Sequence, residues 1–274
     1  MIGVLIRSLR LARRQMTAPA EQPNATPMTQ DPSLIEGPNG TIAYRRDEGD
    51  GPTGVWLGGY ASDMLGTKAQ VLSQAAKDEG RGFLRFDYTG HGESAGAFED
   101  GTVSTWLADA DHAIETLVDG PRVLIGSSMG AWVTLHLALR HPEKVAGIVL
   151  IAPAPDFTKR LVYPRFTDEQ KAELDTKGIV KTGDSGHPAE TYTKALIEDG
   201  DSILLMDKPI ELPCPVRILH GMADDVVPTS HVLELSDLIA CPSLTLTLVK
   251  GGDHRLSEPA DLIRLTDTVR ELSA

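Results

Sequence analysis

Ser128 is the residue most suited to chemistry, because it lies at the centre of a G-x-S-x-G pentapeptide, residues 126–130. The apolar residues 122–125 before it are too few for a helix and predict a buried strand. Residues 131–140 after it favour a helix that ends before Pro142. A serine on a sharp turn between strand and helix exposes its hydroxyl at the end of a sheet, and flanking glycines leave room for neighbouring backbone. This context favours a nucleophile over a plain connecting turn.

His254 is the predicted base for this serine. A serine hydroxyl is a poor nucleophile until a base takes its proton, and the base needs an acid that orients it. His254 lies in a glycine-containing loop after the last long predicted strand, residues 244–249. From such a loop, a histidine can reach a serine across the carboxyl edge of a parallel sheet. No other histidine of the chain occupies an equivalent place.

The orienting acid is expected in the loop after the preceding strand, residues 216–220. That loop carries Asp224 and, next to it, Asp225. The chain order serine, aspartate, histidine is the order expected of a triad on alternating strands and helices. We choose Asp224, with Asp225 as the first alternative. Asp156, just after another predicted strand, is a more distant alternative, and Asp87 is interpreted as a strand-end carboxylate that fixes its own loop.

Two backbone amides are the predicted oxyanion donors. The tetrahedral intermediate of acyl transfer carries a negative oxygen that needs preorganised N–H groups. The amide of Met129, directly after the nucleophile, is the first. The second is expected from the loop after residues 55–57, where Gly58 and Gly59 let the backbone approach a substrate. In that loop we choose the amide of Tyr60.

Other chemistries find little support in the sequence. No P-loop pattern occurs, and no glycine-rich phosphate-binding motif stands between a strand and a helix. No set of cysteines and histidines has the spacing of a zinc site. We therefore expect neither a cofactor nor a metal. His91 has no companion ligand and is interpreted as structural.

Strands and helices alternate along most of the chain, which implies an α/β fold with a mainly parallel sheet covered on both faces. Strands are predicted at residues 41–44, 55–57, 82–86, 122–125, 145–151, 216–220 and 244–249. Helices are predicted at residues 68–79, 103–118, 131–140 and 231–239, and from residue 259 onward.

The alternation breaks after residue 152. Residues 153–212 contain two helical stretches, near 168–176 and 192–206, separated by polar loops. We interpret them as a helical cap inserted into an α/β core, residues 31–152 and 213–274. Eight apolar residues there would suit an acyl chain or pack the cap itself: Phe157, Leu161, Val162, Tyr163, Phe166, Leu204, Leu205 and Met206.

Composition limits the remaining function classes. A net charge of −13 over 274 residues argues against nucleic acid as a partner. No apolar run approaches the length of a membrane span. Cys214 and Cys241 form no disulfide framework, so buried thiols and a reducing compartment are expected. Residues 1–14 hold four arginines and no acid. We expect residues 1–30 to be a disordered extension of a cytoplasmic protein, or a mitochondrial presequence as the alternative.

The sequence resembles the α/β-hydrolase superfamily. Within it, the chain is similar to the family of mitochondrial palmitoyl-protein thioesterases, also described as mycophenolic acid acyl-glucuronide esterases. The resemblance runs from about residue 54 to the end and is weaker between residues 155 and 205. The motifs that carry it are Gly59-Tyr60, Gly66-Thr67-Lys68-Ala69, Arg85-Phe86-Asp87-Tyr88, Gly120-Pro121, Gly126-Ser127-Ser128, His220-Gly221-Met222, Asp224-Asp225, Pro228 and Asp253-His254-Arg255.

This resemblance implies the α/β-hydrolase fold and serine hydrolysis of carboxylic esters or thioesters, with Ser128, Asp224 and His254 as the triad. It implies acyl-glucuronide esterase or palmitoyl-thioesterase-like activity on a small-molecule acyl substrate. One alternative is lactonase, peptidase or perhydrolase chemistry on the same fold. Another is a non-catalytic protein that uses the fold to bind a ligand. The oligomeric state is left open.

Overall fold

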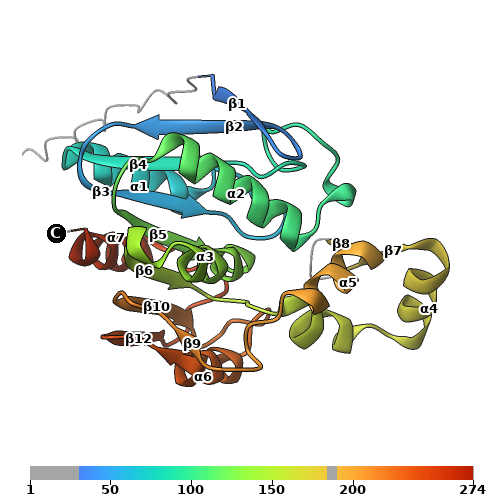
Figure 1. Cartoon of the computed structure of the whole chain (residues 1–274). Coiled ribbons are helices and arrows are strands. Elements are labelled where there is room, and N and C mark those ends of the chain that lie inside the picture. Colours follow the sequence, from blue (N-terminus) through green and yellow to red (C-terminus); the bar gives the residue numbers. More distant parts are fainter. Residues whose placement is uncertain (1–30, 184–189, 274) are drawn as a thin grey trace, which may run out of the picture. The chain divides into compact units, whose positions relative to one another are not determined.

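A computed structural model describes residues 31–183 and 190–273; the predictions for residues 1–30 fall outside this part of the chain. Within it, an eight-stranded sheet has the order β1-β2-β4-β3-β5-β6-β10-β12 (Figure 1). These strands are β1 (Ser33–Gly37), β2 (Gly40–Asp47), β3 (Asp50–Leu57), β4 (Arg81–Phe86), β5 (Arg122–Ser127), β6 (Val145–Ile151), β10 (Val216–Gly221) and β12 (Leu244–Val249). Strands β4 to β12 of this order run parallel, while β1 and β2 form an antiparallel edge. The predicted, mainly parallel sheet is confirmed.

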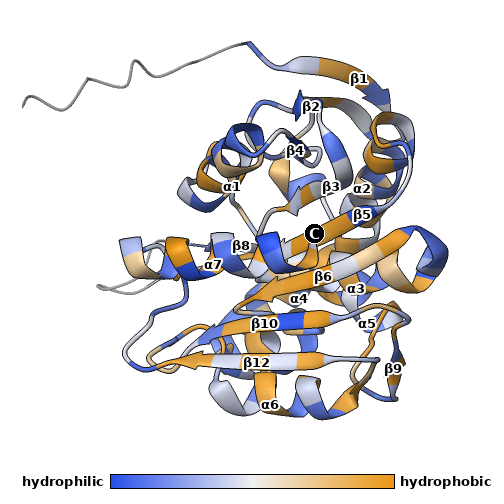
Figure 2. Cartoon of the chain, turned by 90° about the vertical axis from the view of Figure 1, so that its left-hand side faces the viewer, coloured by the Kyte–Doolittle hydropathy of each residue, from blue (hydrophilic) through white to orange (hydrophobic). Residues whose placement is uncertain are grey.

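Helices cover both faces of the sheet. They are α1 (Thr67–Asp78), α2 (Val103–Leu117), α3 (Met129–Arg140), α6 (Thr229–Leu238) and α7 (Pro259–Leu272). Successive residues of a strand point to opposite faces, so Leu124 packs in the layer of α2, α3 and α6, and Val123 in the layer of α1 and α7. Central strands are therefore apolar on both sides. Figure 2 shows this in β5 and β6, whereas β12 at the edge is paler.

The segment predicted as a helical cap (residues 153–212, called the insert below) lies between β6 and β10. Its elements are the π-helix η3 (Thr158–Val162), the 3₁₀ turn η4 (Tyr163–Arg165), α4 (Asp168–Lys177), β7 (Ile179–Thr182), β8 (Glu190–Thr193), α5 (Lys194–Ser202) and β9 (Ile210–Glu211). The helix predicted at 192–206 is shorter, because Tyr192 pairs with Val180 in the β7–β8 ladder and Thr193 caps α5. The insert is thus not purely helical.

The remaining short elements connect the larger ones. They are η1 (Phe98–Asp100), η2 (Pro142–Lys144) and β11 (Ile239–Ala240), which pairs with β9 of the insert. Both cysteines are free; Cys214 is buried as expected, but Cys241 is only half-buried. Among the described residues, no helix has the length and apolarity needed to cross a bilayer.

Candidate active site

Ser128 lies at the junction of β5 and α3 with φ 54° and ψ −119°. A positive φ is uncommon for a residue with a Cβ, and at this junction it turns the side chain out of the sheet. The turn is held by hydrogen bonds from Ser128 N to Ile151 O (2.9 Å) and from Ala154 N to Ser128 O (3.2 Å). The strand, the turn and the helix are those predicted from the pentapeptide.

Close packing requires the two glycines of the pentapeptide. A Cβ on Gly126 would lie 2.3 Å from Thr134 Oγ1. A Cβ on Gly130 would lie 2.1 Å from the carbonyl oxygen of Leu57. Both distances are far below van der Waals contact, so only glycine lets β3, β5 and α3 approach this closely. The glycines of the pattern thus have the steric role predicted for them.

His254 and Asp224 continue from Ser128 in one chain of hydrogen bonds. His254 Nε2 lies 3.1 Å from Ser128 Oγ, and His254 Nδ1 lies 2.8 Å from Asp224 Oδ2. An ionised carboxylate only accepts hydrogen bonds, so Nδ1–H donates to Asp224 and Nε2 accepts the hydroxyl of Ser128. This is the arrangement in which a histidine can take the proton of a serine. The loops after β10 and β12 supply the two residues, as predicted.

The Asp224 carboxylate is buried and accepts several hydrogen bonds. Its side chain has no solvent exposure, whereas that of His254 is 22% exposed. Burial by itself raises the pKa of Asp224, but the hydrogen bond from His254 and the amides of Val227 and Val226 lower it further than burial raises it. The net pKa lies below its ordinary value. Asp224 is therefore ionised at neutral pH, the state needed to orient an imidazole.

The other candidate carboxylates lie elsewhere. Asp156 Oδ1 and Oδ2 accept the amides of Leu205 (2.9 Å) and Met206 (2.8 Å), so this residue ties the two ends of the insert together. Asp87 accepts the amides of Met64 (2.6 Å) and Glu93 (2.9 Å), in agreement with its interpretation as a loop-fixing residue. Of these carboxylates, Asp224 is the one that contacts His254.

Tyr60 and Met129, the predicted oxyanion donors, belong to two segments that adjoin the nucleophile. Met129 begins α3, so its amide has no acceptor within the helix. A Cβ on Gly59 would lie 3.3 Å from Ser128 Cβ, which brings the loop of Tyr60 directly against the nucleophile. The amide assignments remain predictions, and this placement favours them.

The Tyr60 side chain connects this loop to the insert. Its hydroxyl donates to the carbonyl of Thr191 in β8. Its ring stacks on Tyr192, with centroids 5.3 Å apart and planes 4° apart, and lies 5.7 Å from the ring of Phe157. Burial raises the pKa of the Tyr60 phenol far above its usual value, so the hydroxyl stays a donor. The loop that carries a predicted oxyanion donor is thus fixed to the insert by a hydrogen bond and ring contacts.

Two basic residues near the site received no role from the sequence. Lys68 Nζ, at the start of α1, donates to the carbonyl of Arg255, next to His254. Burial lowers the pKa of Lys68 to about 8, although Asp253 opposes this shift. Arg165 of the insert donates to Val226 O (3.0 Å) in the loop of Asp224. These contacts join residues far apart in sequence, and no local pattern signals them.

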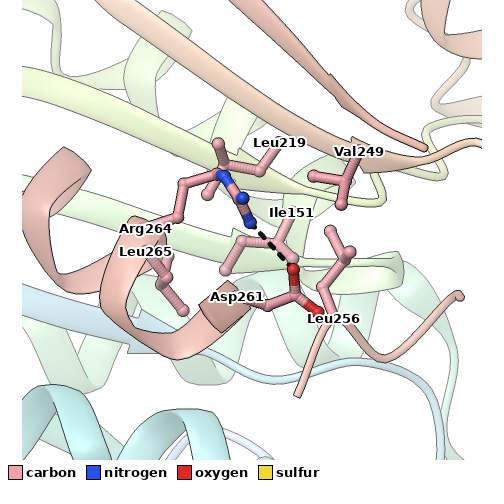
Figure 3. Close-up of a pocket in the computed structure, with 7 residues that line it drawn as sticks. All are labelled: Ile151, Leu219, Val249, Leu256, Asp261, Arg264 and Leu265. Atoms are coloured by element: carbon pink, nitrogen blue, oxygen red, sulfur yellow. Dashed lines mark hydrogen bonds and ion pairs between the residues drawn. The ribbon is translucent and has the colours of Figure 1, made fainter. Parts of the chain in front are cut away.

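The structure also contains a group of possible metal ligands and a small cavity. Among the described residues, Asp111, Glu115 and His141 offer ligand atoms within 4.8 Å of one another. Arg140 and Lys144 already pair with the two carboxylates, so we interpret the group as an ion-pair network. A cavity of about 10 Å³ is lined in part by residues of α7. Figure 3 shows its lining residues, among which Asp261 and Arg264 form an ion pair. The cavity is too small for a substrate. Its lining residues are Ile151, Leu219, Val249, Leu256, Asp261, Arg264 and Leu265.

Comparison with known proteins identifies the family of the chain. The profile of a hydrolase family described as "Serine aminopeptidase, S33" matches residues 59–178. The palmitoyl-protein thioesterase ABHD10 of Mus musculus, named as mitochondrial, is 37% identical over 234 residues, which cover 84% of this chain and 78% of the relative. A relative of this identity and coverage shares the family of the chain.

Solved structures extend the likeness to three dimensions. A putative hydrolase from Agrobacterium vitis S4 is 40% identical with a TM-score of 0.85, covering 89% of this chain and 99% of that one. The structure of mouse ABHD10 is 34% identical with a TM-score of 0.81, covering 89% and 98%. The protein is thus an α/β hydrolase, and it belongs to the family of the palmitoyl-protein thioesterase ABHD10.

Proposed function

We propose that this protein is a serine hydrolase that cleaves carboxylic esters or thioesters through an acyl-enzyme. The observation that carries the proposal is the continuous hydrogen-bonded chain from Ser128 through His254 to the ionised, buried Asp224. Such a chain serves to activate a hydroxyl, and the predicted oxyanion donors Tyr60 and Met129 belong to segments that adjoin the same serine. A buried carboxylate aligned with a histidine and a strained serine has no comparable structural use.

Acylation follows from this geometry. His254 Nε2 takes the proton of Ser128 Oγ as the oxygen attacks the acyl carbon, and the carbonyl oxygen becomes an oxyanion facing the amides of Tyr60 and Met129. Asp224 stabilises the imidazolium that forms. When the tetrahedral intermediate collapses, the bond to the leaving oxygen or sulfur breaks. The leaving group takes the proton from His254 and departs as an alcohol or a thiol.

Deacylation repeats these steps with water. His254, neutral again, takes a proton from a water molecule, whose oxygen attacks the acyl carbon bound to Ser128. The second tetrahedral intermediate collapses with cleavage of the bond to Ser128 Oγ, which recovers its proton from His254. The carboxylic acid leaves and the resting state is restored.

The acyl group is proposed to contact the insert. Five of its apolar side chains are buried, which favours packing within the insert: Phe157, Leu161, Phe166, Leu205 and Met206. Tyr163 is 40% exposed and could contact a substrate. The name of the ABHD10 relatives, palmitoyl-protein thioesterase, supports long-chain acyl thioesters as the first substrates to test. Acyl glucuronides, which the resemblance of the sequence implies, are the second class.

Peptide hydrolysis is the second candidate function. The matched family is described as serine aminopeptidase, and the same triad cleaves amides in other hydrolases. Turnover of aminoacyl p-nitroanilides with no turnover of esters or thioesters of any chain length would favour it.

Fluorophosphonate labelling is the direct test. The wild-type protein is expected to react at Ser128 and to hydrolyse p-nitrophenyl esters and acyl thioesters. Ser128→Ala removes the nucleophile and should abolish labelling and lower kcat by roughly 10⁴-fold or more. Ser127→Ala, which alters the neighbouring hydroxyl, is the matched control and should still be labelled. A folded wild-type protein that resists the probe would refute the proposal.

The cellular location is a separate proposal. The ABHD10 relatives are named as mitochondrial, which supports the presequence alternative for the arginine-rich residues 1–14 over the cytoplasmic one. Mass spectrometry of the N-terminus of the native protein tests it. A chain that begins near residue 28 in a mitochondrial fraction would agree, and a chain that retains residue 1 or 2 would contradict it.

A further inference from the structure

His220 is a fully buried histidine beside the proposed triad. It is the penultimate residue of β10, and its side chain has no solvent exposure. Its Nδ1 lies 3.8 Å from Asp224 Oδ2, the same oxygen that His254 Nδ1 contacts at 2.8 Å. Two imidazoles, one from the sheet and one from the loop after β12, therefore face one carboxylate oxygen.

The ring of His220 receives little stabilisation from the groups around it. Neither of its nitrogens hydrogen-bonds to a protein group within the described part of the chain. A buried polar group without a partner costs about 1–3 kcal/mol of stability. The other buried side chains of β10 are aliphatic: Val216, Ile218 and Leu219. An aliphatic residue at position 220 would fill the strand without this cost, so stability does not account for the histidine.

Burial keeps the ring of His220 neutral. Burial lowers its pKa, Asp224 opposes this shift, and His254 adds to it. The other titratable group that faces it is His231 of α6, whose own pKa is lowered to about 4 by burial. At neutral pH, His220 is thus a neutral imidazole with one N–H, and Asp224 is the one negative group among these neighbours.

We propose that His220 is a positioning residue for the triad, which directs its Nδ1–H at Asp224 Oδ2 and keeps that carboxylate aligned with His254. The inference rests on the proposed hydrolase function and names no new reactant. A movement of about 1 Å brings the contact into hydrogen-bond range, and catalytic hydrogen bonds commonly tighten when substrate binds. The second donor would hold Asp224 in place while His254 carries the serine proton.

The test compares His220→Leu with His220→Asn, because leucine has no N–H and asparagine places one near the position of Nδ1. We expect His220→Leu to be at least as stable as the wild type. Its kcat for p-nitrophenyl butyrate should fall roughly tenfold to a hundredfold with little change in KM. The acid limb of kcat/KM should move to higher pH, because an Asp224 carboxylate that has lost a donor stabilises the protonated base of the triad more strongly. His220→Asn should restore most of the wild-type kcat and most of the wild-type pH profile.

His231→Leu is the matched control. It removes another buried histidine next to His220, but Nε2 of His231 has no partner and its charged neighbours are Arg160 and Glu234. Its kcat and pH profile should stay near those of the wild type.

The outcomes separate the inference from the function on which it rests. If fluorophosphonate does not label the folded wild-type protein, both the hydrolase function and the role of His220 are refuted. A labelled wild type whose kcat and pH profile survive in His220→Leu removes the inference alone. An unfolded leucine variant, or an asparagine variant that recovers nothing, would mark His220 as structural and also overturn it.

Discussion

Ser128 combines its proposed role with a backbone conformation that costs stability. A non-glycine residue in such a region of φ and ψ costs about 1–3 kcal/mol. The conformation persists because Ser128 bonds both Ile151 and Ala154 and because Gly126 and Gly130 remove the side chains that would collide there. Packing and hydrogen bonds around Ser128 therefore stabilise a backbone conformation that presents its hydroxyl.

A single substitution tests whether Asp224 or the adjacent Asp225 is the acid of the proposed triad. Asp224→Asn keeps the size of the side chain but presents an amide to His254, which favours the wrong tautomer of the imidazole. We expect kcat for p-nitrophenyl esters to fall by roughly 10³- to 10⁴-fold with a small change in KM. Steady-state kinetics at pH 7.5 measures this.

Asp225→Asn is the matched control for that substitution. It makes the same chemical change one residue later, and kcat should stay within about threefold of the wild type. If Asp225→Asn were the more damaging change, the acid of the proposed triad would be assigned wrongly.

Between elements, hydrogen bonds and ion pairs hold the insert to itself and to the core. Asp156 is fully buried and accepts the amides of Leu205 and Met206, while Arg160 lies 3.8 Å from it. Tyr60 and Arg165 connect the insert to the loops of the candidate site. Contacts of this kind let the insert influence the site without supplying a member of the proposed triad.

Asp156→Asn tests this structural role. The amide side chain keeps one acceptor and turns its NH₂ group toward a backbone N–H, so we expect a loss of about 1–3 kcal/mol in the free energy of unfolding. Urea denaturation measures the loss. The kcat should stay within about tenfold of the wild type, in contrast to Asp224→Asn. A kcat as low as that of Asp224→Asn in a stable protein would instead support Asp156 as the acid.

Buried neutral histidines set the acid stability of the whole molecule. Burial lowers the pKa values of His91, His136, His220 and His231, the last to about 4. In the unfolded chain each histidine binds a proton near pH 6.5. Below that pH the unfolded state binds more protons than the folded state, so the free energy of unfolding falls as the pH falls.

We therefore expect stability to be highest above pH 6.5 and to decrease from there toward pH 4. His231 alone contributes on the order of 3 kcal/mol of this loss. Denaturation of the wild type and His231→Leu at pH 7.5 and 4.5 measures it, and the variant should lose less stability than the wild type. Equal losses in the two proteins would show that His231 does not carry this effect.

The sequence alone determined the fold class and the positions of the site loops along the chain. The alternation of short apolar strands and amphipathic helices predicts the parallel sheet, because side-chain periodicity is a local property. The pentapeptide around Ser128 and the loops that carry Asp224 and His254 were located in the same way, since parallel strands bring their carboxyl ends to one edge. Element boundaries in the insert were less accurate, because Tyr192 joins a strand ladder that no local pattern requires.

Only the tertiary structure decided which side chains meet. It placed Asp224 at 2.8 Å from His254, and it put Asp156 between the ends of the insert. It also brought Lys68 to the loop of His254 and His220 to Asp224. Apart from the contact between His220 and Asp224, which are four residues apart, these contacts depend on how strands and loops distant in sequence pack together. Neither spacing nor composition carries that information, because burial and distance are properties of the folded chain.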